Sequence, residues 1–199
     1  MTYVMTSKSP RTRMVESTAL LLREHGVTGT GMRDIAEHAQ APRGSLQHYF
    51  PDGKDQVVSE ALVLVGDQAT GWLAKVLAAD EPMPARAVVA KMFKGWQRAM
   101  TTSDYLAGCP IVATVTDAVA NDQLRGGAAQ AFDRWAVALT AALFRGGLSK
   151  SRAGRSALLA ISALEGAIVL ARAQRSLTPL NDVARELDEY LAGLLEPTG

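Results

Sequence analysis

The segment from Gly26 to Lys54, GVTGTGMRDIAEHAQAPRGSLQHYFPDGK, constrains the fold of this chain more than any other part. Its apolar residues recur at helical spacing on both sides of a short break, which predicts two short helices joined by a tight turn. The second of these helices combines small, basic and aromatic side chains. A helix of this composition suits insertion into a DNA groove, so the segment indicates a helix-turn-helix.

Charge is distributed unevenly along the chain, although the formal net charge is only +1. The first thirteen residues contain Lys8, Arg11 and Arg13 and no acid, whereas residues 55–199 hold 14 basic and 15 acidic side chains. A mildly basic front end on a neutral remainder is typical of a compact DNA-binding head attached to a larger body. We therefore expect a head at residues 1–53 and a body at residues 54–199.

Helical spacing of apolar residues continues along nearly the whole chain. It predicts helices at about 11–25, 32–39, 42–50, 54–79, 84–100, 110–119, 128–145, 152–175 and 179–195. Pro42 is expected to open the third helix, because the first turn does not use the missing N–H. No alternating strand, repeat or low-complexity segment interrupts this pattern. The expected fold is all-α, with about nine helices forming a three-helix head and a helical body.

Several function classes are disfavoured by the residues present. The single cysteine, Cys109, excludes an intrachain disulfide and fits a reducing compartment. The N-terminus lacks the apolar core of a signal peptide, and the longest uncharged run, residues 105–116, is too short and broken to span a bilayer. The histidines have no metal-ligand spacing, and no nucleophile elbow or His–Asp pair is evident. We expect a cytoplasmic protein with no metal, no cofactor and no catalytic residue.

The residues of the predicted motif have the chemistry for contacts with double-stranded DNA. Gly44 and Ser45 allow the backbone to approach closely, and Gln47 has the donor and acceptor that suit adenine. Arg43 can reach guanine or a phosphate. The other candidates for contacts with DNA, mainly with its phosphates, are Lys8, Arg11, Thr28, Thr30, His48, Tyr49 and Lys54. Each side chain alone could simply solvate a surface helix, but their combination in this order favours DNA binding.

The same residues resemble the helix-turn-helix of the tetracycline-repressor (TetR) family. The matching positions are Gly31-Met32-Arg33-Asp34-Ile35-Ala36, Ala39, Arg43-Gly44-Ser45-Leu46, His48-Tyr49-Phe50 and Lys54. Chain length, helix count and two apolar C-terminal helices also resemble the family. The APRGSL variant, Gly108-Cys109-Pro110 and LEGAIVLARAQRS resemble the branch that regulates multidrug-efflux genes. The resemblance implies a homodimeric regulator whose body binds a small hydrophobic or aromatic effector.

Three positions depart from the family pattern. Gln40 stands where the family has glycine, so a positive φ at this turn would cost more here. Gln47 replaces a common tyrosine, which puts a family phosphate contact in doubt. Pro42 replaces a serine or threonine and removes a capping hydroxyl.

The middle of the body is rich in aromatic residues and methionine, which line sites between helices and adapt to varied ligands. An ordinary packed core uses the same residues, so the prediction of a pocket depends mainly on the resemblance. Glu165 interrupts the apolar run 157–171 and must be paired, protonated or facing water. It either binds a cationic ligand or pairs with Arg155 or Arg172 across the dimer, and pairing is the favoured alternative. The candidate effector residues are Trp72, Met92, Phe93, Trp96, Met100, Tyr105, Phe132, Trp135 and Glu165.

The last two helices carry apolar faces that suit pairing across a two-fold axis into a four-helix bundle. The candidate interface residues are Ala163, Gly166, Ala167, Leu170, Ala173, Val183, Leu187, Tyr190 and Leu194. The alternative is that both faces pack only within their own subunit.

Together these patterns predict a homodimeric regulator that binds a palindromic operator, most simply a repressor released by a small hydrophobic effector. Two alternatives remain open at this stage. One is a regulator controlled by a protein partner without a ligand, and the other is a helical carrier or enzyme that uses the body cavity.

Overall fold

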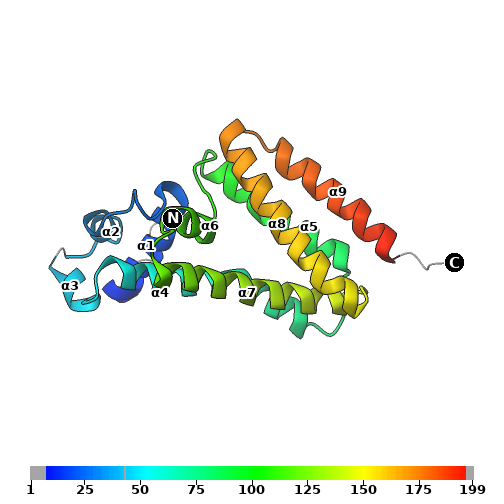
Figure 1. Cartoon of the computed structure of the whole chain (residues 1–199), viewed down its shortest axis with the longest axis horizontal. Helices are drawn as coiled ribbons and strands as arrows, with labels where there is room; N and C mark the ends of the chain where they lie inside the picture. The colour runs from blue at the N-terminus through cyan, green and yellow to red at the C-terminus, as the bar shows by residue number, and fades with distance from the viewer. Residues whose placement is uncertain (1–7, 43, 196–199) are drawn as a thin grey trace. The chain divides into compact units, whose positions relative to one another are not determined.

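A computed structural model describes residues 8–42 and 44–195, and every regular element in those ranges is an α-helix (Figure 1). This confirms the all-helical fold. The nine helices of the described residues are α1 (Pro10–His25), α2 (Met32–His38), α3 (Ser45–Tyr49), α4 (Lys54–Ala78), α5 (Ala85–Thr102), α6 (Pro110–Asp117), α7 (Asp122–Arg145), α8 (Lys150–Gln174) and α9 (Thr178–Leu195).

Two helix starts differ from the sequence-based expectation. Helix α3 begins at Ser45 rather than at Pro42, because both the amide and the hydroxyl of Ser45 donate to the Pro42 carbonyl and close a turn first. Helix α7 begins at Asp122, six residues before the expected start at Ala128. The side chain of Asn121 accepts the amide of Leu124 at 3.1 Å, which caps this longer helix.

The chain divides into two compact units. Unit 1 comprises residues 1–67 and 109–132, and unit 2 comprises residues 68–108 and 133–199. The division therefore differs from the expected boundary at residue 53, because α6 and the first parts of α4 and α7 belong with the head. Sequence spacing identifies helices but does not say which of them pack together.

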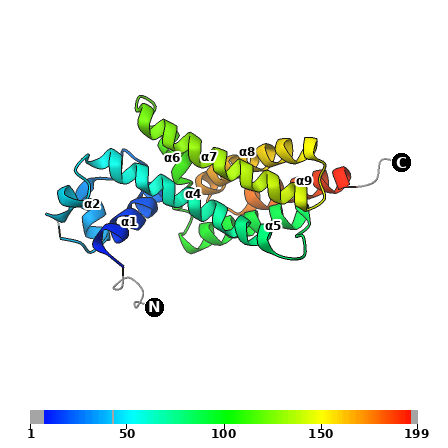
Figure 2. The same ribbon diagram turned by 90° about the horizontal axis from the view of Figure 1, so that it is seen from below.

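The core of unit 1 is built where α1 packs against α2 and α6 (Figure 2). Met14 of α1 and Ile35 of α2 are fully buried, and Leu46 and Phe50 bring the short α3 into the same cluster. Burial of these large side chains fixes a five-residue helix that would be unstable alone.

In unit 2, α9 packs against both α5 and α8 (Figure 1). The ion pair between Arg86 of α5 and Asp188 of α9 joins two of these helices at the surface. The guanidinium of Arg145, at the end of α7, donates to the carbonyls of Leu77 and Ala79. It thereby satisfies carbonyl groups that the end of α4 leaves without a helical partner.

Two helices of the described residues, α4 and α8, are long and apolar enough to cross a membrane by length and composition alone. The sequence criterion of an uncharged run missed them because Glu60, Asp67 and Glu165 interrupt them. Half of the most apolar window of α8 is buried inside the protein. Core helices commonly have this character, so the finding is weak evidence for a membrane span.

Candidate DNA-binding and effector sites

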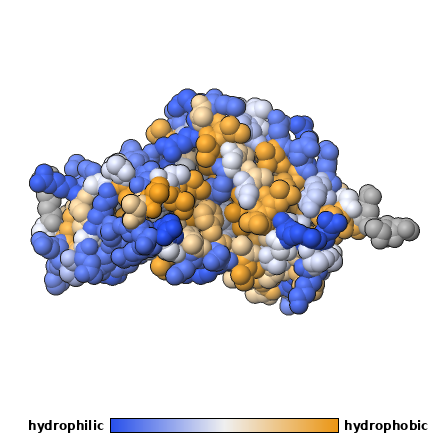
Figure 3. Space-filling model, viewed as in Figure 1, coloured by the Kyte–Doolittle hydropathy of each residue, from blue (hydrophilic) through white to orange (hydrophobic). Residues whose placement is uncertain are grey.

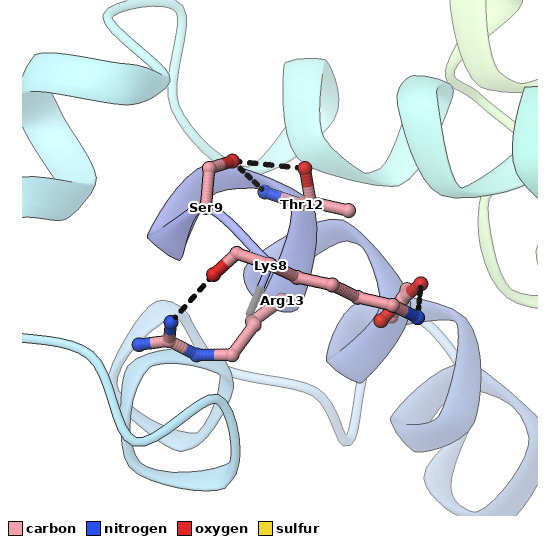
Figure 4. A network of polar contacts seen from close by, with 5 residues as sticks. Lys8, Ser9, Thr12 and Arg13 are labelled. Atoms are coloured by element: carbon pink, nitrogen blue, oxygen red, sulfur yellow. Dashed lines mark hydrogen bonds and ion pairs between the residues drawn. The ribbon is translucent and has the colours of Figure 1, made fainter. Parts of the chain in front are cut away.

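The turn between α2 and α3 contains a residue with positive φ, at the position where the family pattern has glycine. Gln40 has φ 49°, in the left-handed region that glycine adopts most easily. Arg13 of α1 fixes this turn, since its guanidinium donates to the carbonyls of Ala39 at 3.0 Å and Gln40 at 3.2 Å. It also donates to the carbonyl of Lys8 at 2.9 Å (Figure 4). One side chain therefore ties the start of α1 to the helix-turn-helix.

Helix α3 divides its side chains between the core and the solvent. Leu46 and Phe50 are buried, whereas Gln47 and His48 are exposed. Tyr49 is half-buried, and the ring of His48 meets its ring edge-on at 5.2 Å between centroids. This places the predicted base-reading residue Gln47 on the open face of the helix.

Of the residues at the front of α3, Gly44 is exposed and Ser45 is half-buried. Adding a Cβ at Gly44 would meet nothing within 4 Å, so the backbone there is open to a partner. Arg43 lies outside the described residues, and its contact with DNA stays a prediction.

In the loop before α2, the expected contact of Thr30 with DNA is wrong. Thr30 is fully buried, and its hydroxyl donates to the Gly26 carbonyl at 2.6 Å, so that hydroxyl stabilises the loop and is not available to a phosphate. Thr28 is exposed, but its amide donates to Asp117 of α6 at 3.3 Å. The ammonium group of Lys54 donates to the Val27 carbonyl, which engages it in the same loop.

The cations at the start of α1 are exposed but engaged by acids. Lys8 Nζ lies 2.6 Å from Glu16 Oε1, in the network drawn in Figure 4. Arg11 Nη2 lies 2.6 Å from Glu60 Oε1 of α4. Both cations remain candidates for phosphate contacts, in which a phosphate would compete with the carboxylate.

Sequence reasoning missed four residues that organise this site: Arg13, Glu16, Glu60 and Asp117. The pairs Lys8–Glu16, Arg13–Ala39, Arg11–Glu60 and Thr28–Asp117 span 8, 26, 49 and 89 positions of the chain. No local spacing signals such pairs. Only Arg13 stood out, as a cation in an acid-free N-terminus, and nothing in the pattern assigned it a partner.

The candidate effector residues differ in burial. Met92, Phe93, Met100 and Trp135 are buried in unit 2, while Trp72, Trp96, Tyr105 and Glu165 of that unit are half-buried. Phe132 belongs to unit 1 and is half-buried. Both carboxylate oxygens of Glu165 are inaccessible to solvent. Unit 2 therefore has the apolar side chains expected of an effector-binding region. That a ligand binds there stays a prediction.

Two further features of the described residues bear on chemistry. Cys109 is buried, 6% exposed, at the N-cap of α6. Burial lowers the pKa of the nearby Arg23, and the Cys109 thiol and the Glu24 carboxyl oppose that shift. Among the residues that the structure covers, no group of three His, Cys, Asp or Glu side chains is arranged to hold a metal ion.

The predicted dimer surface needs correction at two positions. Ala167 of α8 and Leu187 of α9 are buried inside unit 2, 1% and 6% exposed, so they serve the subunit's own core. The other candidates are accessible to different degrees. Gly166, Leu170, Ala173 and Tyr190 are exposed, and Ala163, Val183 and Leu194 are half-buried.

Helix α8 presents an apolar surface that the sequence analysis identified only in part. Leu158, Leu159, Val169 and Leu170 are 43–63% exposed, and they flank the exposed Gly166. Apolar surface gathers over the α8–α9 part of unit 2 in Figure 3. Four exposed leucine and valine side chains on one helix are unusual for a helix that faces only water.

Comparison with known families identifies the family of this chain. Residues 15–61 match the description "Bacterial regulatory proteins, tetR family", and residues 84–186 match "Transcriptional regulator LmrA/YxaF-like, C-terminal domain". The chain belongs to the TetR family of transcriptional regulators. It is a DNA-binding regulator of the helix-turn-helix type, in a family of non-enzymes, and the resemblance found in the sequence is confirmed.

Individual relatives agree with this TetR membership. An uncharacterised HTH-type transcriptional regulator of Mycobacterium tuberculosis is 37% identical over 191 residues, which cover 92% of this chain and 95% of that protein. The HTH-type transcriptional regulator LmrA of Bacillus subtilis is 25% identical over 91% of this chain and 96% of its own. The crystal structure of a TetR-family protein from Rhodobacter sphaeroides, 19% identical, has the same fold, with a TM-score of 0.79 over 90% of this chain and 97% of that one.

Proposed function

We propose that this TetR-family regulator is a cytoplasmic repressor that binds a palindromic operator as a homodimer and is released by a small hydrophobic effector. The observation that carries the DNA part is the division of α3 between two faces. Leu46 of α3 and Phe50, the C-cap that follows it, are buried in the unit 1 core, while Gln47 and His48 are exposed. A helix anchored on one face and open on the other suits the major groove.

Within this proposal, Gln47 reads a base and the surrounding groups hold the phosphates. The amide of Gln47 has the donor and acceptor that pair with adenine. Lys8, Arg11, Thr28 and Tyr49 are accessible near α3 or at the start of α1 and α2, where they would contact the backbone of the duplex.

Gel-shift titration with the DNA flanking the protein's own gene tests this assignment. Gln47→Ala should lose about 1–3 kcal/mol of preference at a single base-pair position, because one bidentate contact disappears. Gln130→Ala, an exposed glutamine of α7 in the same unit, is the matched control and should bind as the wild type does. Unchanged sequence preference in Gln47→Ala would remove Gln47 from the reading face.

The exposed apolar surface of α8 supports the homodimer. Leu158, Leu159, Val169 and Leu170 supply apolar area, and the small Gly166 lets a second helix approach closely. A two-fold pairing would hold two heads about 34 Å apart, one helical turn of DNA. A single head gives only weak binding, so operator specificity depends on this pairing.

Sedimentation of Leu170→Glu tests the interface. A buried carboxylate at the pairing surface costs several kcal/mol, so this variant should be monomeric at micromolar concentration and should fail to bind a palindromic site. Val137→Glu adds the same charge at a 70% exposed position of α7 and should remain dimeric. A wild-type protein that is monomeric and still binds a palindromic DNA site tightly would contradict both the interface and the spacing mechanism.

The effector part of the proposal rests on unit 2, where Met92, Phe93, Met100 and Trp135 are buried together with other apolar groups. A ligand that binds better to the conformation with wrongly spaced heads would release DNA by shifting the population. All three tryptophans belong to unit 2, so quenching of intrinsic fluorescence reports binding there.

A panel of hydrophobic aromatic compounds should include one that quenches this fluorescence and weakens the gel shift at the same concentration. Trp96→Ala should lose that response and keep DNA binding. A panel without quenching and without any effect on DNA binding would favour control by a protein partner.

A further inference from the structure

The two cations at the start of α1 that are expected to contact phosphates are each neutralised inside unit 1. Lys8 is paired with Glu16 and Arg11 with Glu60, both at 2.6 Å. The side chains of the second pair are 46% exposed for Arg11 and 28% exposed for Glu60. The cation is therefore reachable from solvent, and its acidic partner is the more enclosed of the two.

Glu60 is held in place by a second hydrogen bond. Its Oε1 also accepts from the Gln56 side-chain amide at 3.2 Å, and Gln56 in turn accepts the backbone amide of Asp52 at 3.2 Å. The Arg11 guanidinium lies over the ring of Phe50, 5.4 Å from its centroid. Phe50 is the C-cap residue that directly follows α3, so the guanidinium lies beside the end of the recognition helix.

We propose that Glu60 sets the DNA affinity of unit 1 by acting as an intramolecular counter-ion of Arg11. Glu60 is a positioning residue here and does not itself touch DNA. The proposal rests on the proposed contact of Arg11 with a phosphate. A phosphate that binds Arg11 competes with the Glu60 carboxylate for the guanidinium, which Glu60 engages through Nη2. The nearby carboxylate also repels the phosphate.

The groove beside this pair gives Arg11 room to move. Arg11 and Glu60 line a groove of about 320 Å³ between α1 and α4, together with the apolar side chains of Val15, Val63 and Leu64. The groove is open to solvent, and Val63 is 50% exposed. Arg11 can therefore swing from Glu60 toward a phosphate without disturbing packed side chains.

The effect has a defined size and salt dependence. An exposed ion pair contributes up to about fivefold in an equilibrium constant, so removing Glu60 should tighten DNA binding by up to about fivefold per head at low salt. A cation freed from its internal partner also makes the slope of log affinity against log salt about 0.9 more negative. The gain should consequently shrink as the salt concentration rises.

Fluorescence anisotropy with a labelled duplex of mixed sequence, about three helical turns long, tests the proposal without knowledge of the operator. Glu60→Gln is compared with the wild type between about 50 and 200 mM salt. Gln at this position retains an acceptor for Gln56, and thermal unfolding checks that the variant is folded. Glu81→Gln, an exposed acid in the α4–α5 turn, changes the net charge equally and is the matched control.

A double-mutant cycle with Arg11→Gln then shows whether Glu60 acts through Arg11. The expected result is tighter binding and a steeper salt slope in Glu60→Gln, no change in Glu81→Gln, and no gain from Glu60→Gln once Arg11 is removed. Equal or weaker binding by Glu60→Gln, or the same gain in the control or without Arg11, overturns the counter-ion role. A folded wild type that does not bind the duplex at low salt overturns the proposed phosphate contact instead, and the inference with it.

Discussion

Replacing Gly26 by alanine tests how the loop before α2 is held. Gly26 has φ 70° and ψ −176°, a backbone region that is accessible almost only to glycine. A Cβ added there would lie 2.3 Å from Oδ2 of Asp117, the carboxylate that accepts the Thr28 amide. The substitution therefore meets two separate obstacles, backbone strain and a collision.

The cost can be worked out for each obstacle. Backbone strain of this kind costs about 1–3 kcal/mol. Moving the Asp117 carboxylate aside also breaks its hydrogen bond with Thr28, which contributes about 1 kcal/mol. We expect Gly26→Ala to lower the free energy of unfolding by about 2–4 kcal/mol. The measurement is urea denaturation followed by helical circular dichroism, with tryptophan fluorescence reporting unit 2 separately.

Two controls separate the contributions. Gly53→Ala places a Cβ at φ 76° with nothing within 4 Å, so it should show only the strain. The double variant Gly26→Ala, Asp117→Ala relieves the collision and should recover part of the loss relative to Gly26→Ala. The reasoning is refuted if Gly26→Ala is no less stable than Gly53→Ala, or if removing the Asp117 carboxylate recovers nothing.

Three further substitutions have defined outcomes. Gln40→Gly should raise the free energy of unfolding by up to about 1 kcal/mol, since relief of the left-handed conformation exceeds the added chain entropy; a loss in the same urea assay would contradict this. Arg145→Ala should destabilise unit 2 by about 1–3 kcal/mol by fluorescence-detected unfolding, because the carbonyls ending α4 lose their donor, and an unchanged midpoint would show that water replaces it. The hydrogen bond from Arg86 lowers the pKa of Asp188, so the pair stabilises the fold above the ordinary aspartate pKa and loses that contribution as pH falls through the lowered value. The Tm difference between wild type and Asp188→Asn should therefore vanish in acid, and a difference independent of pH would contradict the linkage.

The sequence predicted the local features of the DNA-binding site well because they depend on neighbouring residues. Helical spacing identified α1, α2 and α3, and the missing glycine raised the question of a positive φ at Gln40, which the structure answers. The start of α3 was wrong because Pro42 is followed by a hydrogen-bonded turn before the helix begins. Both outcomes involve contacts only a few residues apart.

Long-range partners were not predictable in the same way. The acids that engage Lys8 and Arg11 lie on other turns or other helices. The sequence pattern also gives no sign that Thr30 is buried. Helix α8 is apolar on nearly every side, so spacing alone could not decide which face is internal. Ala167 was therefore assigned to a surface that Leu158 and its exposed neighbours occupy instead.

The position of Cys109 allows local opening at the start of α6 to be measured in the unmodified protein. This one thiol of the sequence is almost inaccessible, at the N-cap residue that precedes α6. A thiol reagent can react with it only when that helix end opens, so the labelling rate measures a local opening equilibrium directly. The labelling rate can be measured with and without DNA or a candidate effector. A slower rate would show that the added molecule stabilises the start of α6, with no substitution in the chain.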